Sequence, residues 1–256
     1  MRRKMVVGNW KMHGNLLENK PLLNAIVTNL NGLQEVSFLV CVPYLYLPSV
    51  QDTLRNTNIA WGAQNVSQYE KGPYTGEISA LMLNDFECGY VIVGHSERRT
   101  LFGEDNRTVS EKYQAAQRAG ITPILCVGET LEQREAGTTE QVIEEQIASV
   151  IKLAGIKSLA NAIIAYEPLW AIGTGRTASP EQAQDIHSFI REGLAKQDAN
   201  IAKDLTILYG GSVKSNNASE LFDMPDIDGG LIGGASLIAA DFVAICRGFT
   251  SIIFLE

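Results

Sequence analysis

Short apolar runs recur along the chain at similar intervals, and each run has the length of a buried strand. Between them lie longer segments in which apolar residues recur every three or four positions, the spacing of an amphipathic helix. Strands that alternate with helices in this way predict a parallel sheet joined by crossover helices. We predict eight strands, at residues 5–8, 36–42, 59–63, 90–93, 121–127, 162–166, 205–208 and 230–232, alternating with eight helices.

The segment of residues 180–196 gives the clearest helical signal. Ser179 is a suitable N-cap, and Pro180 stands at the first helical position, where a missing N–H leaves no helical hydrogen bond unmade. The apolar residues that share one face of this predicted helix are Ile186, Phe189, Ile190 and Leu194.

Two architectures fit this alternation, a closed (β/α)8 barrel and a doubly wound open sheet. Polar residues or glycine pairs end almost every predicted strand, and only a closed barrel brings all strand ends to one pocket. We therefore predict a (β/α)8 TIM barrel, formed as a single domain by residues 1–256, because no linker-like segment divides the chain. The strand-end groups are Asn9 and Lys11, Gln64 and Asn65, His95, Cys126 and Glu129, Glu167, residues 210–212, and Gly233 and Gly234.

The charge balance is acidic, because 21 Lys and Arg residues stand against 29 Asp and Glu residues, for a formal net charge of −8. This balance argues against a nucleic-acid surface or a polybasic membrane anchor, and it still allows an anionic small molecule in a locally positive pocket. No run reaches transmembrane length, and three His residues without an HExxH motif indicate no metal site. Cys41, Cys88, Cys126 and Cys246 lack CxxC spacing and lie in or beside apolar runs, which predicts buried, reduced thiols in a cytoplasmic protein.

Glu167 comes directly after the strand predicted at residues 162–166 and begins a loop that contains glycines. A carboxylate at the carboxyl end of a buried parallel strand is where α/β enzymes hold catalytic groups. Glu167 is therefore the first candidate for a general base, and the loop after it is a candidate lid.

His95 follows the strand predicted at residues 90–93. Ser96 is a plausible N-cap and Glu97 would lie in the first turn, so His95 is expected beside the N-terminus of a helix. The positive end of the helix dipole disfavours imidazolium. A neutral ring would be able to donate a hydrogen bond to a carbonyl oxygen.

Two glycine pairs, at residues 210–211 and 233–234, end the last two predicted strands. Glycines there let backbone N–H groups approach a ligand, and a short helix near Gly234 would direct its N-terminus at an anion. Either pair alone could be an ordinary turn, but both together favour a phosphate site. Lys11 would add a full positive charge to such a pocket.

The segment of residues 64–77 forms a long loop without helical periodicity. A loop of this length within a compact domain is usually functional or docked on another surface. We expect it to contact a partner subunit, with a plain surface excursion as the alternative.

Five motifs of the chain, taken in order, closely resemble those of the triosephosphate isomerase family. The resemblance extends from the first predicted strand to the last. The motifs are Asn9-Trp10-Lys11-Met12, Gly94-His95-Ser96-Glu97-Arg98-Arg99, Tyr166-Glu167-Pro168-Leu169-Trp170-Ala171-Ile172-Gly173-Thr174-Gly175, Tyr209-Gly210-Gly211-Ser212 and Gly233-Gly234-Ala235-Ser236.

This resemblance implies the interconversion of dihydroxyacetone phosphate and D-glyceraldehyde 3-phosphate in glycolysis and gluconeogenesis, through an enediolate and without a cofactor or metal. It implies that Glu167 moves the carbon-bound proton and that neutral His95 polarises the carbonyl. Lys11 and Asn9 would stabilise the enediolate and bind substrate. The phosphate would be held by backbone N–H groups of Gly173, Ser212, Gly233 and Gly234.

The resemblance also implies a lid and a homodimer. Residues 168–178 would close over the substrate, with Pro168, Trp170, Ile172, Gly173, Thr174 and Gly175 in the lid. The long loop would insert, around Thr75, beside residues 9–14 of the partner. His13, Pro73 and Arg176 differ from the residues usual in the family, and they leave interface packing and lid kinetics open.

Two alternatives remain at this stage. Another phosphate-binding barrel, such as an aldolase, would need a Schiff-base lysine inside the barrel, and the sixth strand ends in Glu167 instead. A non-catalytic barrel that only binds a sugar phosphate would have no need for a base, an electrophile and a lid together.

Overall fold

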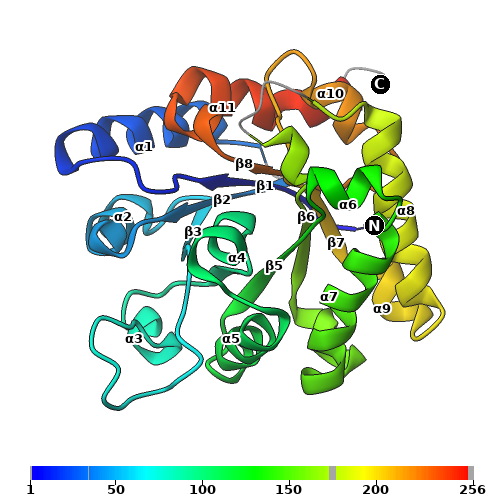
Figure 1. The fold of residues 1–256 in the computed structure, drawn as a ribbon. Helices are drawn as coiled ribbons and strands as arrows, with labels where there is room; N and C mark the ends of the chain where they lie inside the picture. The colour runs from blue at the N-terminus through cyan, green and yellow to red at the C-terminus, as the bar shows by residue number, and fades with distance from the viewer. Residues whose placement is uncertain (1, 34, 173–176, 253–256) are drawn as a thin grey trace.

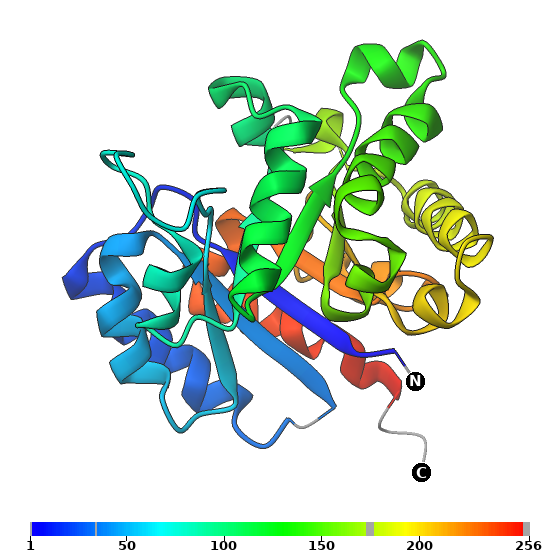
Figure 2. The same ribbon diagram turned by 90° about the horizontal axis from the view of Figure 1, so that it is seen from below.

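The computed structural model describes residues 2–33, 35–172 and 177–252. Eight parallel strands pair in sequence order, and β8 returns to β1 to close a barrel. Figures 1 and 2 show the strands side by side at the centre with helices around them. The strands are β1 (Lys4–Asn9), β2 (Val36–Val42), β3 (Ile59–Ala63), β4 (Tyr90–Val93), β5 (Thr122–Val127), β6 (Ile163–Tyr166), β7 (Thr206–Tyr209) and β8 (Gly229–Ile232).

The predicted barrel is confirmed, and each predicted strand matches an observed one to within one residue at either end. The helices are more numerous than one per strand. They are α1 (Leu16–Leu30), α2 (Leu47–Leu54), α3 (Ala80–Asn84), α4 (Ser96–Phe102), α5 (Asn106–Arg118), α6 (Leu131–Glu135), α7 (Thr139–Ala154), α8 (Pro180–Ala195), α9 (Ala199–Asp204), α10 (Ala218–Phe222) and α11 (Ala239–Cys246), with 3-10 turns η1 (Tyr44–Tyr46), η2 (Ile156–Asn161), η3 (Leu169–Ala171), η4 (Gly234–Leu237) and η5 (Arg247–Ile252).

The extra helix after β4 has a local cause. Gly103 ends α4 in the left-handed conformation, with φ of 67°, and Asp105 then caps α5 by accepting from the Thr108 N–H at 2.7 Å. The chain therefore makes two helices where the sequence predicts one. The prediction for α8 is confirmed, since Ser179 is its N-cap and forms a capping box with Gln182.

The core has two layers because each strand is covered on both faces. Alternate strand residues such as Met5, Val7 and Leu39 fill the barrel interior, while their neighbours, such as Val6 and Phe38, pack against the helices. Burial of both faces explains why the strands form unbroken apolar runs in the sequence. All four cysteines are buried and free, as predicted. In the described part of the chain, no helix has the length and apolar character needed to cross a bilayer.

The long loop of residues 64–77 contains no helix or strand, as predicted, and it extends away from the barrel ahead of α3 (Figure 1). Thr75 is exposed in it. The rings of Tyr69 and Tyr74 stack with their centroids 3.9 Å apart, which gives the loop its own packing.

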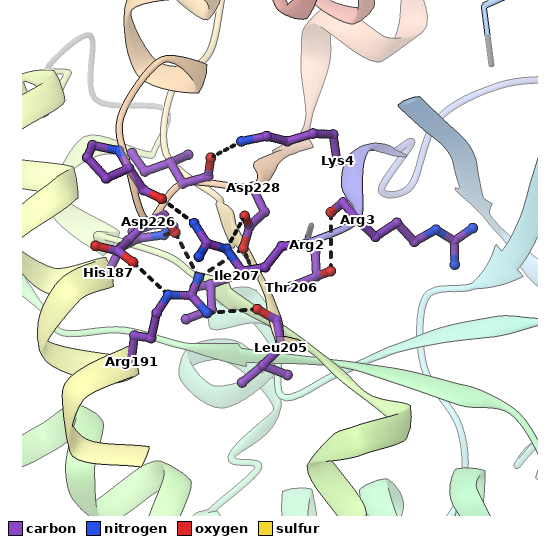
Figure 3. A network of polar contacts seen from close by, with 12 residues as sticks. Arg2, Arg3, Lys4, His187, Arg191, Leu205, Thr206, Ile207, Asp226 and Asp228 are labelled. Atoms are coloured by element: carbon purple, nitrogen blue, oxygen red, sulfur yellow. Dashed lines mark hydrogen bonds and ion pairs between the residues drawn. The ribbon is translucent and has the colours of Figure 1, made fainter. Parts of the chain in front are cut away.

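The amino end of the barrel is closed by a polar network (Figure 3). Asp228, which precedes β8 and is fully buried, accepts hydrogen bonds from Arg2 at 2.8 Å, from Arg191 at 2.9 Å and from the Ile207 N–H at 2.9 Å. Arg191 reaches from α8 and also donates to Asp226 at 2.6 Å. Two cations and a peptide N–H thus surround one buried carboxylate, so its charge is well compensated.

Candidate active site

The carboxyl ends of the strands surround a cavity of about 310 Å³. Residues from the ends of five strands line it, as the barrel architecture leads one to expect. Of the lid residues, Ile172 reaches this cavity, while Gly173, Thr174 and Gly175 lie outside the described residues. The other predicted site residues that line the cavity are Asn9, Lys11, His95, Glu167, Ser212, Gly233 and Gly234.

Glu167 follows β6 directly, and its backbone N–H donates to the Val127 carbonyl at 2.7 Å. The residue is 2% exposed; its Oε2 accepts from the Ser96 N–H at 2.8 Å, and its Oε1 lies 3.0 Å from His95 Nε2. Burial raises the pKa of Glu167, but His95, the Ser96 N–H and Lys11 together outweigh it and leave the pKa below its ordinary value. The side chain is thus a carboxylate that can accept a proton.

Two glycines leave the space that Glu167 occupies. A Cβ atom on Gly210 would lie 2.8 Å from Glu167 Cγ, and one on Gly128 would lie 1.8 Å from the Glu167 carbonyl oxygen. A side chain at Gly210 would displace the Glu167 side chain, and one at Gly128 would displace the Glu167 backbone. The first residue of the first glycine pair therefore makes room for Glu167, a role that the sequence analysis did not assign to it.

His95, and not Ser96, is the N-cap of α4. Its Nδ1 accepts from the Glu97 N–H at 3.2 Å, so the imidazole takes the place of a capping hydroxyl. The prediction of Ser96 as N-cap is wrong by one residue for this reason. Ser96 becomes the first helical residue, and its N–H turns to Glu167.

A neutral ring that accepts at Nδ1 carries its proton on Nε2, which faces Glu167 in the cavity. Burial lowers the pKa of His95, but the Glu167 carboxylate more than offsets this and raises the pKa above its ordinary value. The contact with Glu167 thus opposes the dipole effect used in the sequence analysis. The hydrogen bond from the Glu97 N–H to Nδ1 is one that the neutral ring makes, whereas the carboxylates of Glu167 and Glu97 favour the charged ring.

Lys11 follows β1 with a φ of 53°, in the left-handed region that residues with side chains seldom adopt. Its N–H donates to Asn9 Oδ1 at 3.0 Å, and its carbonyl accepts from Gln64 Nε2 at 2.9 Å. These bonds hold the unusual backbone in place. Lys11 Nζ, which lines the cavity, donates to Glu97 Oε1 at 2.6 Å.

The sequence analysis missed the support that Gln64 and Glu97 give to Lys11. Gln64 also donates to Asn9 Oδ1 at 3.2 Å and to the Cys41 carbonyl at 3.1 Å. Its place at a strand end was a usable signal. No local pattern pairs Glu97 with a lysine 86 residues earlier in the chain.

The second glycine pair leaves the backbone open to the cavity. A Cβ atom on Gly234 would meet nothing within 4 Å, and one on Gly233 would meet only Lys11 Cε, at 3.5 Å. Ser212 and Lys214 line the same region. Peptide groups within reach of a ligand, next to two lysines, suit an anion such as a phosphate.

The first part of the predicted lid is anchored beside β5. Pro168 precedes the turn η3, and Trp170 Nε1 donates to Glu129 Oε1 at 2.9 Å. The Arg134 guanidinium lies 4.4 Å from the centroid of the Trp170 ring. This segment therefore joins Glu167 to the cavity rim through a fixed turn.

Comparison with known proteins gives a consistent result. The family model for triosephosphate isomerase matches residues 4–249. Three similar proteins, each named triosephosphate isomerase, come from Nitrosomonas eutropha (61% identical over 245 residues, 96% of this chain and 97% of the relative), Nitrosomonas europaea (62% over 245 residues, 96% and 97%) and Thiobacillus denitrificans (62% over 247 residues, 96% and 98%). They do not favour an aldolase or a non-catalytic barrel.

Proposed function

The chain belongs to the triosephosphate isomerase family, and we propose that its site interconverts dihydroxyacetone phosphate and D-glyceraldehyde 3-phosphate with Glu167 as the base. One observation carries the assignment of residues: a carboxylate, an imidazole and a lysine from three strand ends line one cavity of about 310 Å³ with the open glycine pair. A three-carbon phosphoester is small enough for these groups to contact it together.

Glu167 removes the carbon-bound proton next to the carbonyl and returns it to the neighbouring carbon. The hydrogen bond from the Ser96 N–H, which lowers the pKa of Glu167 against the effect of burial, supports this role because the base must be ionised before the reaction. The Ser96 N–H and His95 contact its carboxylate oxygens in the free site, and a substrate could replace them. Proton transfer from carbon produces the enediolate.

His95 donates its Nε2 proton to the substrate carbonyl and helps to move protons between the two substrate oxygens. The acceptor role of Nδ1 toward Glu97 supports this, because it leaves the donor on the cavity side. Lys11 and Asn9 stabilise the negative charge that develops on these oxygens. Both line the cavity, and Asn9 also holds the Lys11 backbone.

The phosphate binds at the backbone N–H groups of Ser212, Gly233 and Gly234, and Gly173 joins them from the lid. The open approach at the second glycine pair supports this placement. Residues 168–178 close over the substrate and exclude water that would divert the enediolate toward phosphate loss. The anchored turn at Trp170 gives such a lid a fixed base.

The chain forms a homodimer through the loop of residues 64–77, with Thr75 beside residues 9–14 of the partner. Large apolar side chains exposed in the single chain support this interface, among them Met12 at 94%, Leu45 at 84% and Phe102 at 66% exposure. The mass of the protein in solution tests it, and a monomer at micromolar concentration would contradict it. A cytoplasmic location is supported by the four free, buried thiols.

The experiment that tests the function is a coupled assay of triose phosphate isomerisation on purified protein, in the presence of a metal chelator. We expect activity in both directions in the chain itself and its near-complete loss in Glu167→Gln. An inactive parent protein would refute the function. An active Glu167→Gln variant would refute the assignment of the base and leave the function standing.

A further inference from the structure

A second cavity, of about 180 Å³, lies beside the active site, and Glu167 lines both cavities. We call it the rear cavity. Arg99 of α4 lines the rear cavity, together with Ser96 and Gly128. Arg99 is the last residue of the second family motif, and the mechanism above gives it no role, although it shares this space with Glu167.

Arg99 ties together the ends of two neighbouring strands. Its Nε donates to the Gly94 carbonyl at 2.8 Å, and its Nη2 donates to the Cys126 carbonyl at 3.3 Å. Gly94 directly precedes His95 at the end of β4, and Cys126 lies near the end of β5, which pairs with β6 ahead of Glu167. One rigid guanidinium fork thus spans the scaffold of both His95 and Glu167.

The Arg99 guanidinium can lie close to Gly94 because this residue has no side chain. A Cβ atom at Gly94 would lie 3.0 Å from Arg99 Nη2 and 2.7 Å from Val109 Cγ1, and the residue has a φ of 69°. A side chain here would therefore displace the guanidinium. Asn106 Oδ1 accepts from Arg99 Nη1 at 2.8 Å and completes the set of oxygen acceptors.

The charge of Arg99 is partly buried and is not neutralised by contact. Among the described residues, no carboxylate oxygen lies within 4.0 Å of its guanidinium, whereas the adjacent Arg98 pairs with Glu104 at 2.5 Å. Burial lowers the pKa of Arg99, and Cys126, Glu167 and Glu104 act in the opposite direction. The Cys126 thiol is neutral because burial raises its pKa well above the usual range. Among the carboxylates, Glu167 therefore attracts the Arg99 cation most strongly, ahead of Glu104.

We propose that Arg99 is a positioning residue for the active site: it holds the ends of β4 and β5 in register behind His95 and Glu167, and it shares the rear cavity with the Glu167 side chain. The inference rests on the proposed role of Glu167 as the base. The other titratable groups that face Glu167 are His95 from the end of β4, Lys11 from the end of β1 and Cys126 from β5. Arg99 acts from behind and touches no substrate.

The test uses Arg99→Met and Arg99→Lys, with Arg107→Met as control, because Arg107 is an exposed arginine of the adjacent helix α5. The pKa of Glu167 is measured in the free enzyme by 13C NMR of the carboxyl group, assigned with Glu167→Gln, and kcat and KM are measured in parallel. In Arg99→Met we expect the pKa of Glu167 to rise by more than about 0.3 pH unit and kcat to fall about tenfold, with KM within about twofold.

In Arg99→Lys the charge remains and the fork is lost, so we expect a lower kcat and a pKa of Glu167 within about 0.3 of the parent value. Arg107→Met should match the parent protein in both kcat and the pKa of Glu167. A folded Arg99→Met variant with an unchanged Glu167 pKa or an unchanged kcat would overturn the proposal. If Arg99→Met fails to fold, a kcat of Arg99→Lys equal to that of the parent protein would overturn the proposal. If Arg99→Met loses thermal stability but the pKa of Glu167 does not change, Arg99 has only a structural role. Activity in Glu167→Gln would instead refute the base itself.

Discussion

At the amino end of the barrel, Asp228 is held by two arginine side chains and a peptide N–H, all within 2.9 Å. At the carboxyl end, Glu167 is equally buried, but it contacts one peptide N–H and the imidazole of His95. The two carboxylates differ in whether their partners can be exchanged. Asp228 loses stability if any partner leaves. Glu167 has partners that a substrate could replace, as its proposed role as a base requires.

The largest effect should come from Glu167→Gln, which removes the proton acceptor and keeps the size of the side chain. We expect kcat to fall by at least ~10²- to 10⁴-fold, as for the loss of a general base. Steady-state kinetics measure the loss, and the affinity for inorganic phosphate, which should remain near the parental value, serves as control. A rate within tenfold of the parent would remove Glu167 from this role.

The corresponding change at the other end is Asp228→Ala, which leaves Arg2 and Arg191 without their shared carboxylate. We expect the free energy of unfolding to fall by about 3–5 kcal/mol, the usual result of breaking a buried pair, with kcat of the folded enzyme within about twofold of the parent. Urea denaturation measures the loss. If stability were kept and catalysis impaired, the contrast between the two ends would be wrong.

His95→Ala tests the second partner of Glu167. Loss of the Nε2 donor should raise the activation barrier by about 3 kcal/mol, comparable to the loss of one oxyanion donor. The ratio kcat/KM reports it, and circular dichroism checks that α4 persists without its N-cap. Unchanged turnover would assign carbonyl polarisation to another group.

The smallest expected effect concerns His187. Its titration should change the stability of the protein without changing the activity of the site at the carboxyl end. His187 is fully buried near the amino-end network, and burial lowers its pKa to about 3. The unfolded chain, with an ordinary pKa near 6.5, binds the proton more tightly, so stability falls as the pH drops from about 6.5 toward about 3. At pH 5 the loss should be about 2 kcal/mol.

The control for that prediction is His187→Gln, which should show a shallower decline of unfolding free energy between pH 6.5 and 4. Equal slopes for the variant and the parent would exclude His187 as the source. Activity per folded molecule should not follow this titration, since His187 does not line the active-site cavity.

The sequence locates each strand to within one residue because strands covered on both faces form unbroken apolar runs. The helices are harder to count, because the break at Gly103 depends on how the chain turns back toward the barrel. Among site residues, Glu167 and His95 are identifiable from their places at strand ends. The role of His95 in place of Ser96 as the N-cap cannot be identified in this way, because it depends on the imidazole ring accepting from the N–H of Glu97, two residues later.

The supporting contacts are the part that the sequence does not reveal. Glu97 meets Lys11, and Arg99 meets the Cys126 carbonyl, across gaps in the chain that no periodicity spans. Such contacts depend on the closure of the barrel as a whole. The roles of Gly173, Thr174 and Gly175 remain predictions, because they lie outside the described residues.

The ion pair between Arg2 and Asp228 joins residues 226 positions apart, and β1 pairs with β8 beside it. The residues of β1 therefore gain their neighbours in β8 only after the intervening chain has been made. At ordinary rates of synthesis this delay is on the order of ten to fifty seconds. During that time β1 lacks its β8 neighbour and has one unpaired edge, and an unpaired strand edge is where chains associate wrongly.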